Sequence, residues 1–137
     1  MREVTKKLVE WEGYRQYAYR CTEGVLTIGV GRVIEQGGPG LTLEESMVLL
    51  ENDIERVERD LTDAYPWFED LSENRRIAMV SMAFQLGMGG LAQFKNGLAS
   101  LRSGDWQSAH DHFMDSKWAR EQTPNRAEEV CQLILAG

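Results

Sequence analysis

The stretch EGYRQYAYRCTEGVLTIGVG, from Glu12 to Gly31, decides the fold expected for the first part of this chain. Two runs rich in β-forming residues, Tyr17–Tyr19 and Val25–Val30, flank the turn-forming sequence Thr22–Gly24. Such a pattern predicts a β-hairpin in which Gly24 adopts a positive φ. It is preceded by a short amphipathic helix over residues 5–12, which Gly13 ends.

The rest of the chain reads as helical. After a loop at Gln36–Gly40, Thr42 and Glu45 have the spacing of a capping box at the start of a long helix, which should end before Pro66. Ser72, Asp105 and the Thr123-Pro124 pair are further N-terminal signals. They predict helices over residues 73–86, 106–114 and 124–135, and a further helix over residues 91–102 is expected between the breaks at Gly87–Gly90 and Ser103-Gly104. In the first of these helices, Ile77, Val80, Ala83 and Phe84 are expected to be buried.

These elements predict an α+β fold that is mostly α, with two lobes in a single domain. A small hairpin lobe covers residues 13–41, a connecting helix covers 42–64, and a helical lobe covers 65–137 and includes the N-terminal helix. A cleft between two lobes is the usual place for a site in such a fold.

Composition excludes several classes of function. The net charge is −7, from 22 acidic and 15 basic residues, with no basic stripe of the kind that nucleic-acid-binding domains carry. The two cysteines make neither a disulfide framework nor a zinc motif. We see no signal peptide and no apolar run of membrane-spanning length. We therefore expect a protein made in the cytoplasm, without stable membrane insertion. We also expect a monomer.

Glu12 is the candidate general acid, although a lone glutamate at a helix end is usually a surface residue. Its neighbours include Trp11, Tyr14 and Tyr17, and a carboxyl group in partly apolar surroundings has a raised pKa that suits proton donation near neutral pH. Cys21 lies in a polar, turn-like sequence, which is unusual for a buried structural cysteine.

Other constellations are weaker. His110 and His112 are two residues apart on a predicted helix, so they point in different directions and do not form a paired metal site. The pair Gly29 and Gly31 indicates close approach of the backbone to a packing partner or ligand, but is too short for a phosphate loop. From the residues alone, an enzyme and a binding module are equally well supported.

The chain also resembles the phage-type lysozymes, a glycoside hydrolase family. The matching residues are Glu12-Gly13, Cys21, Thr22-Glu23-Gly24 and Thr27-Ile28-Gly29-Val30-Gly31, followed by NRRIAMVSMAFQLG from Asn74 and QTPNRA from Gln122. Together they cover nearly the whole chain in order.

The resemblance implies a muramidase that cleaves the β-1,4 bond between N-acetylmuramic acid and N-acetylglucosamine in peptidoglycan, with no metal or cofactor. It implies that Glu12 is the general acid, and that Cys21 and Thr27 hold a water on the opposite face of the sugar, as in inverting glycosidases. It also implies that Arg126 pairs with Glu12. Residues near the sugar subsites would be Phe84, Gln85, His112 and the supporting Gly31.

Three departures from the family pattern matter: the residues at positions 21 and 32, and a short segment between Gly31 and Thr42 that makes the N-terminal lobe smaller. Cys21 stands where many members carry aspartate, and it could act as base, nucleophile or bystander. Arg32 replaces a histidine that forms a structural ion pair in the T-even lysozyme.

The leading hypothesis is an endolysin that accumulates in the host cytoplasm and reaches the wall through a separate holin-type pore. The alternative is a lysozyme-fold module with weakened or lost catalysis that binds glycan or serves as a structural part of a virion.

Overall fold

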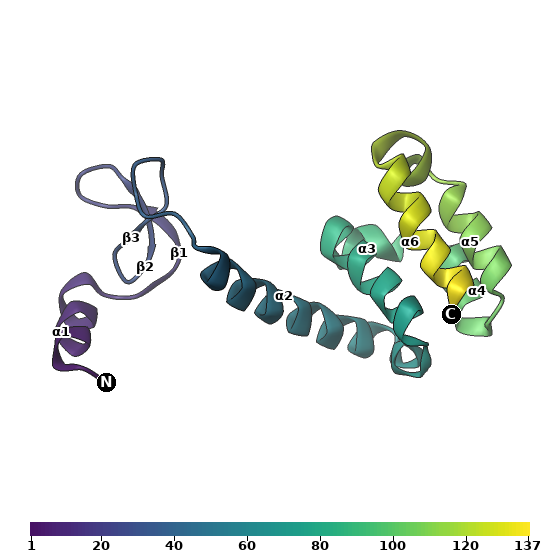
Figure 1. The fold of residues 1–137 in the computed structure, drawn as a ribbon, viewed down its shortest axis with the longest axis horizontal. Helices are drawn as coiled ribbons and strands as arrows, with labels where there is room; N and C mark the ends of the chain where they lie inside the picture. Colours follow the sequence, from purple (N-terminus) through teal and green to yellow (C-terminus); the bar gives the residue numbers. More distant parts are fainter. The chain divides into compact units, whose positions relative to one another are not determined.

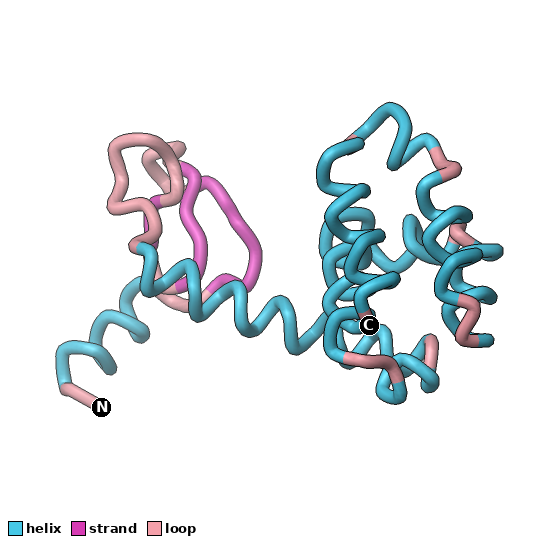
Figure 2. The backbone as a smooth tube through the Cα atoms, turned by 45° about the vertical axis from the view of Figure 1, so that its right-hand side comes forward, coloured by secondary structure: helices cyan, strands magenta, loops and turns pink.

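The computed structural model describes all 137 residues and contains two compact units, which we describe separately. Residues Met1–Val48 form the first, here called the sheet unit, and Leu49–Gly137 form the second, here called the helical unit. All strands belong to the sheet unit (Figures 1 and 2). The predicted class, a mostly α fold with a small antiparallel sheet, is confirmed.

The sheet unit begins with helix α1 (Glu3–Glu12), followed by the strands β1 (Arg15–Arg20), β2 (Leu26–Gly29) and β3 (Arg32–Val33). The strands form an antiparallel sheet in the order β1-β2-β3. The predicted hairpin corresponds to β1 and β2, and Gly24 in its turn has a φ of +79°. Strand β3 was not expected, because two residues are too few to give a sequence pattern.

Helix α2 (Leu43–Ala64) begins in the sheet unit and continues into the helical unit. Its predicted capping box is present. The Glu45 N–H donates to Thr42 Oγ1 at 3.1 Å, and the Thr42 N–H donates to Glu45 Oε1 at 3.0 Å. These two bonds satisfy backbone donors that the first helical turn leaves free. The helix ends before Pro66, as predicted.

After α2, the helical unit contains four further helices and two short irregular turns. In chain order these are the 3₁₀ turn η1 (Pro66–Asp70), α3 (Glu73–Ala92), α4 (Lys95–Ser103), α5 (Trp106–Met114), the π-helical turn η2 (Trp118–Gln122) and α6 (Pro124–Ala136). Helix α5 packs against both α4 and α6, and α6 packs against α3. Side chains of Ser72 and Asp105 cap α3 and α5, as predicted.

The core of the helical unit differs from the prediction for α3. Ala83 is buried as expected, but Ile77 and Phe84 are 46% and 47% exposed in the helical unit, and Val80 is half-buried. The neighbouring face of α3, which carries Ala78, Met79 and Met82, enters the core instead. The small and flexible side chains of this face allow α3 to pack closely on α6. The prediction was based on hydrophobicity alone, which favoured burial of the bulkier side chains of Ile77 and Phe84.

Two further predictions for the helical unit were partly correct. Gly87 interrupts α3 with non-helical dihedrals (φ 75°, ψ 166°), yet the helix resumes and continues to Ala92. Thr123 does precede α6, but its side chain does not cap that helix.

No single helix is long and apolar enough to cross a membrane, although α3 and α4, bent by 108° at their break, meet the length and composition criteria as a pair.

Candidate active site

Glu12 is the last residue of α1, and its carboxyl group lies against the backbone of Gly31. Gly13 ends the helix with a φ of +71°, and its N–H donates to the Val9 carbonyl at 2.9 Å. A Cβ atom built on Gly31 would lie 3.0 Å from Glu12 Oε2 and 3.1 Å from its carboxyl carbon. A Cβ atom at position 31 would therefore require the Glu12 carboxyl group to shift by a few tenths of an ångström.

Thr27 is the buried polar residue of the hairpin. It lies on β2 opposite Tyr19, and it is only 3% exposed. Its hydroxyl donates to the Val25 carbonyl at 2.9 Å, so the side chain has a fixed orientation. An oriented hydroxyl with acceptor capacity left over is suited to holding a water molecule.

Cys21 is half-buried and begins the turn between β1 and β2. Its N–H donates to the Val25 carbonyl at 2.9 Å, and its carbonyl accepts from the Gly24 N–H at 2.8 Å. Hydrogen bonding from the backbone at Val25, and then at Glu23, lowers the pKa of the Cys21 thiol. The turn thus favours the thiolate, the form of cysteine that acts as base or nucleophile.

The helical unit holds four of the predicted site residues. Gln85 has a fixed orientation, because its Oε1 accepts from the Trp118 indole N–H and its Nε2 donates to Thr123 Oγ1, both at 3.2 Å. The Thr123 hydroxyl thus accepts from Gln85, whereas it makes no capping hydrogen bond to α6. Phe84 and Arg126 line one cavity of about 450 Å³.

Arg126 Nη2 donates to Ser81 Oγ at 2.9 Å. His112 is exposed and lines a different cavity, of about 700 Å³, together with Lys95, Lys117 and Trp118.

The structure therefore brings together some of the predicted site residues within each unit. Glu12 contacts Gly31, Cys21 and Thr27 share the Val25 carbonyl, and Phe84 shares a cavity with Arg126. The pairing of Arg126 with Glu12 would join residues of the two units and stays a prediction. No group of three or more histidine, cysteine, aspartate or glutamate side chains is arranged to hold a metal ion.

Sequence reasoning missed Glu35 and the partner of Arg32. Arg32 forms an ion pair with Glu45 at 3.0 Å, so the arginine has its own structural partner where the family histidine is missing. Glu35 accepts hydrogen bonds from both Arg20 and the Leu26 N–H. Neither contact has a local signature, because the residues involved are between 9 and 15 positions apart.

A carboxyl group at the end of the first helix, a hairpin carrying a thiol and a hydroxyl, and a mostly helical second unit define a lysozyme-like protein. The family model described as phage lysozyme matches residues 9–130, and the chain belongs to this family.

Its similarity extends to several known proteins. It is 34% identical to the pre-baseplate central spike protein Gp5 of enterobacteria phage T4, over 92% of this chain but 26% of that protein. It is 27% identical to the probable T4-type lysozyme 1 of Dictyostelium discoideum, over 92% of this chain and 89% of that one. It is 29% identical to an endolysin of Acyrthosiphon pisum secondary endosymbiont phage 1, over 90% and 82% respectively.

Proposed function

We propose that this protein is a muramidase that hydrolyses the β-1,4 bond between N-acetylmuramic acid and N-acetylglucosamine in peptidoglycan. The observation that carries the proposal is the packing of the Glu12 carboxyl group on Gly31, in the same unit as the hairpin with Cys21 and Thr27. Membership of the phage lysozyme family and the similarity to an endolysin support this substrate.

The proposed reaction inverts the configuration at the anomeric carbon. Glu12 protonates the oxygen of the leaving sugar as its bond to the anomeric carbon breaks. A water held by Thr27 attacks the opposite face, and the Cys21 thiolate accepts the proton of that water. After each turnover Glu12 regains a proton from solvent and Cys21 releases one. Phe84, Gln85, His112 and Arg126 are proposed to contact the glycan or support the site from the helical unit.

In the cell, the proposed role is that of an endolysin. The protein would accumulate in the host cytoplasm, reach the wall through a separate holin-type pore, and act there as a monomer. The similarity to the Gp5 spike protein supports a second candidate, a lysozyme-fold module that serves in a virion and binds glycan without cleaving it.

The two candidates differ in the products that they leave. Purified protein is added to permeabilised Gram-negative cells, clearing is followed by turbidity, and the glycan fragments are reduced with borohydride and identified by mass spectrometry. A muramidase produces new reducing ends on N-acetylmuramic acid. The matched Glu12→Gln variant keeps the shape of the side chain but cannot donate a proton, so its rate should fall by about two to four orders of magnitude. Binding to sacculi without any new reducing ends supports the non-catalytic module.

The stereochemistry requires a separate measurement. Proton NMR of freshly cleaved soluble glycan reports the first anomer formed, and an inverting enzyme acting on a β bond releases the α anomer first. If the β anomer appears first, the reaction proceeds with retention, and direct attack by the Cys21 thiolate on the anomeric carbon replaces the water mechanism.

A further inference from the structure

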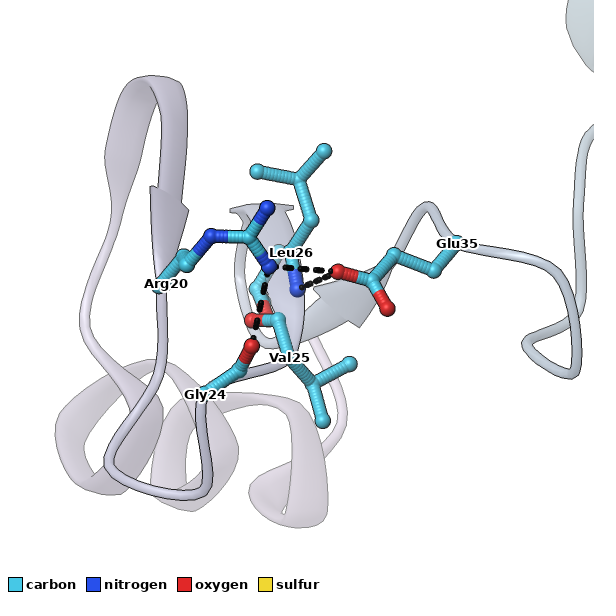
Figure 3. Close-up of polar contacts among 6 residues, drawn as sticks. Arg20, Gly24, Val25, Leu26 and Glu35 are labelled. Carbon is cyan, nitrogen blue, oxygen red and sulfur yellow. Dashed lines mark hydrogen bonds and ion pairs between the residues drawn. The ribbon is translucent and has the colours of Figure 1, made fainter.

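The side chains of Arg20 and Glu35 form hydrogen bonds at the end of the turn that carries Cys21. Arg20 is the last residue of β1, and Glu35 follows β3 by two positions. The Arg20 guanidinium donates to the Glu35 carboxylate at 2.9 Å and to the Gly24 carbonyl at 3.0 Å (Figure 3). The same carboxylate oxygen accepts from the Leu26 N–H at 2.7 Å. We call these two side chains and their three hydrogen bonds the Arg20–Glu35 latch.

The latch fixes the turn from outside, at both of its ends. Arg20 precedes Cys21 directly and reaches across to the Gly24 carbonyl, while Glu35 holds the N–H of Leu26, the first residue of β2. Inside the turn, the main chain closes on itself through Cys21, Val25 and Gly24. One carboxylate oxygen thus ties together both arms of the hairpin and the segment that follows β3.

The Arg20–Glu35 latch contributes too little to the free energy of unfolding for stability to be its main role. The Arg20 and Glu35 side chains are 65% and 38% exposed, and ion pairs at such positions contribute little to the free energy of unfolding. Three hydrogen bonds that share one carboxylate oxygen and one guanidinium nitrogen have a stronger effect on local geometry. The geometry they control is that of the five-residue turn around the Cys21 sulfur.

We propose that Arg20 and Glu35 are positioning residues, which hold the Cys21 turn in the conformation that the hydrolytic step needs. This inference rests on the proposed function, in which Cys21 handles the attacking water. The backbone at Val25 and Glu23 faces the Cys21 sulfur only while the turn keeps its shape, and a small displacement of an oriented catalytic group slows a reaction considerably. Neither Arg20 nor Glu35 touches the reacting atoms in this mechanism.

The central test uses two substitutions at one position. Glu35→Ala removes both contacts of the carboxylate, while Glu35→Gln keeps an acceptor for the Leu26 N–H and loses the charge. The rate of alkylation of Cys21 by iodoacetamide is measured against pH, with the label located by peptide mass. Cys131 is fully buried, and burial raises the pKa of its thiol to about 12, so it serves as an unreactive internal reference.

In Glu35→Ala we expect the alkylation midpoint to move to higher pH, towards that of a free thiol. On a soluble peptidoglycan fragment, kcat should fall about tenfold while KM changes less than about twofold, since the latch does not contact the glycan. Glu35→Gln should lie between Glu35→Ala and the wild type in both measurements. Asp53→Ala is the matched control, because it removes another exposed ion pair, with Arg56, without touching the hairpin.

The inference is overturned if Glu35→Ala and Glu35→Gln both keep the wild-type alkylation profile and kcat. It is also overturned if Asp53→Ala causes the same losses, because the effect then reflects general destabilisation. If Glu35→Ala does not fold, Glu35→Gln and Arg20→Lys give the same comparison. A wild-type protein that creates no new reducing ends contradicts the proposed function, whereas the alkylation profiles still decide whether the latch controls Cys21.

Discussion

The Glu12 carboxyl group lies directly on the backbone of Gly31, where a Cβ atom would approach its Oε2 to 3.0 Å. This contact joins the end of α1 to the turn between β2 and β3, which are separate in sequence. The absence of a side chain at position 31 leaves room for the exposed carboxyl group of the proposed general acid. Glycine at position 31 is thus favoured by this close approach as well as by its φ of +69°.

We predict that Gly31→Ala reduces activity by at least about tenfold relative to Gly29→Ala, because a misplaced catalytic group slows the reaction. Gly29 is the matched control. Its φ is +68°, but a Cβ atom there would meet no atom within 4 Å. Both variants suffer the strain of a side chain in the left-handed region, about 1–2 kcal/mol, so their melting temperatures should fall by similar amounts. Equal activity losses in the two variants would show that the contact with Glu12 is unimportant.

The ion pair between Arg32 and Glu45 leads to a pH-dependent prediction for the start of α2. Hydrogen bonds from the backbone and side chain of Thr42, and then the charge of Arg32, lower the pKa of Glu45. A lowered pKa in the folded state stabilises the protein above the ordinary glutamate value of 4.5. That contribution is lost as the pH falls through the lowered pKa.

Glu45→Gln should therefore lower the melting temperature slightly at pH 7, and the difference from the wild type should disappear in strong acid. The glutamine keeps the capping hydrogen bonds with Thr42 but loses the charge that pairs with Arg32. Thermal denaturation followed by circular dichroism over a series of pH values measures the effect. Glu44→Gln, one residue earlier in the same helical turn, controls for the general loss of a negative charge. A difference that persists unchanged at low pH would contradict the electrostatic origin.

Packing of α4 against α5 gives a prediction about stability alone. A Cβ atom on the buried Gly97 would come within 2.8 Å of the Phe113 ring, which is fully buried. Gly97→Ala should therefore destabilise the protein by about 1–3 kcal/mol, as overpacked core substitutions do. Gly89→Ala is its control, since nothing lies within 4 Å of that position in α3. There, alanine should be neutral or stabilise the helix by up to about 1 kcal/mol. Urea denaturation of both variants measures the difference.

Local chemistry explains which parts of the fold could be predicted from the sequence. The capping box of Thr42 and Glu45, the caps at Ser72 and Asp105, and the positive φ of Gly24 all depend on residues within four positions of one another. These features were predicted, and the structure contains them. Helix α5 even begins and ends at the expected residues, Trp106 and Met114.

Features that depend on distant partners could not be predicted in this way. Which face of α3 enters the core depends on how closely α6 approaches, so the burial expected for Ile77 and Phe84 was wrong within the helical unit. Thr123 gave a clear capping signal, but its hydroxyl binds Gln85 instead. The Arg20–Glu35 latch joins residues 15 positions apart and has no pattern in the sequence.

Cys21 provides the most direct test of the proposed chemistry. The pKa of the Cys21 thiol is lowered below the ordinary value of 9.0, mainly by hydrogen bonding from the backbone at Val25. The thiolate therefore becomes populated at a lower pH than in a free cysteine. If the thiolate is the base, activity should climb on the alkaline side as the pH rises through this lowered pKa. A Cys21→Asp variant should show no such climb, because its carboxylate is already ionised at neutral pH.

Cys21→Ser separates the acidity of the side chain from its size. A hydroxyl is close to a thiol in shape but does not ionise in this pH range, so wall clearing should fall by about two to four orders of magnitude if Cys21 is the base. Iodoacetamide should inactivate the wild type, with a rate that follows the same alkaline climb, and should leave Cys21→Asp unaffected because Cys131 is fully buried. If Cys21→Ser and the alkylated wild type both clear walls at the untreated rate, Cys21 is a bystander. The Thr27 hydroxyl would then hold a water that another group activates.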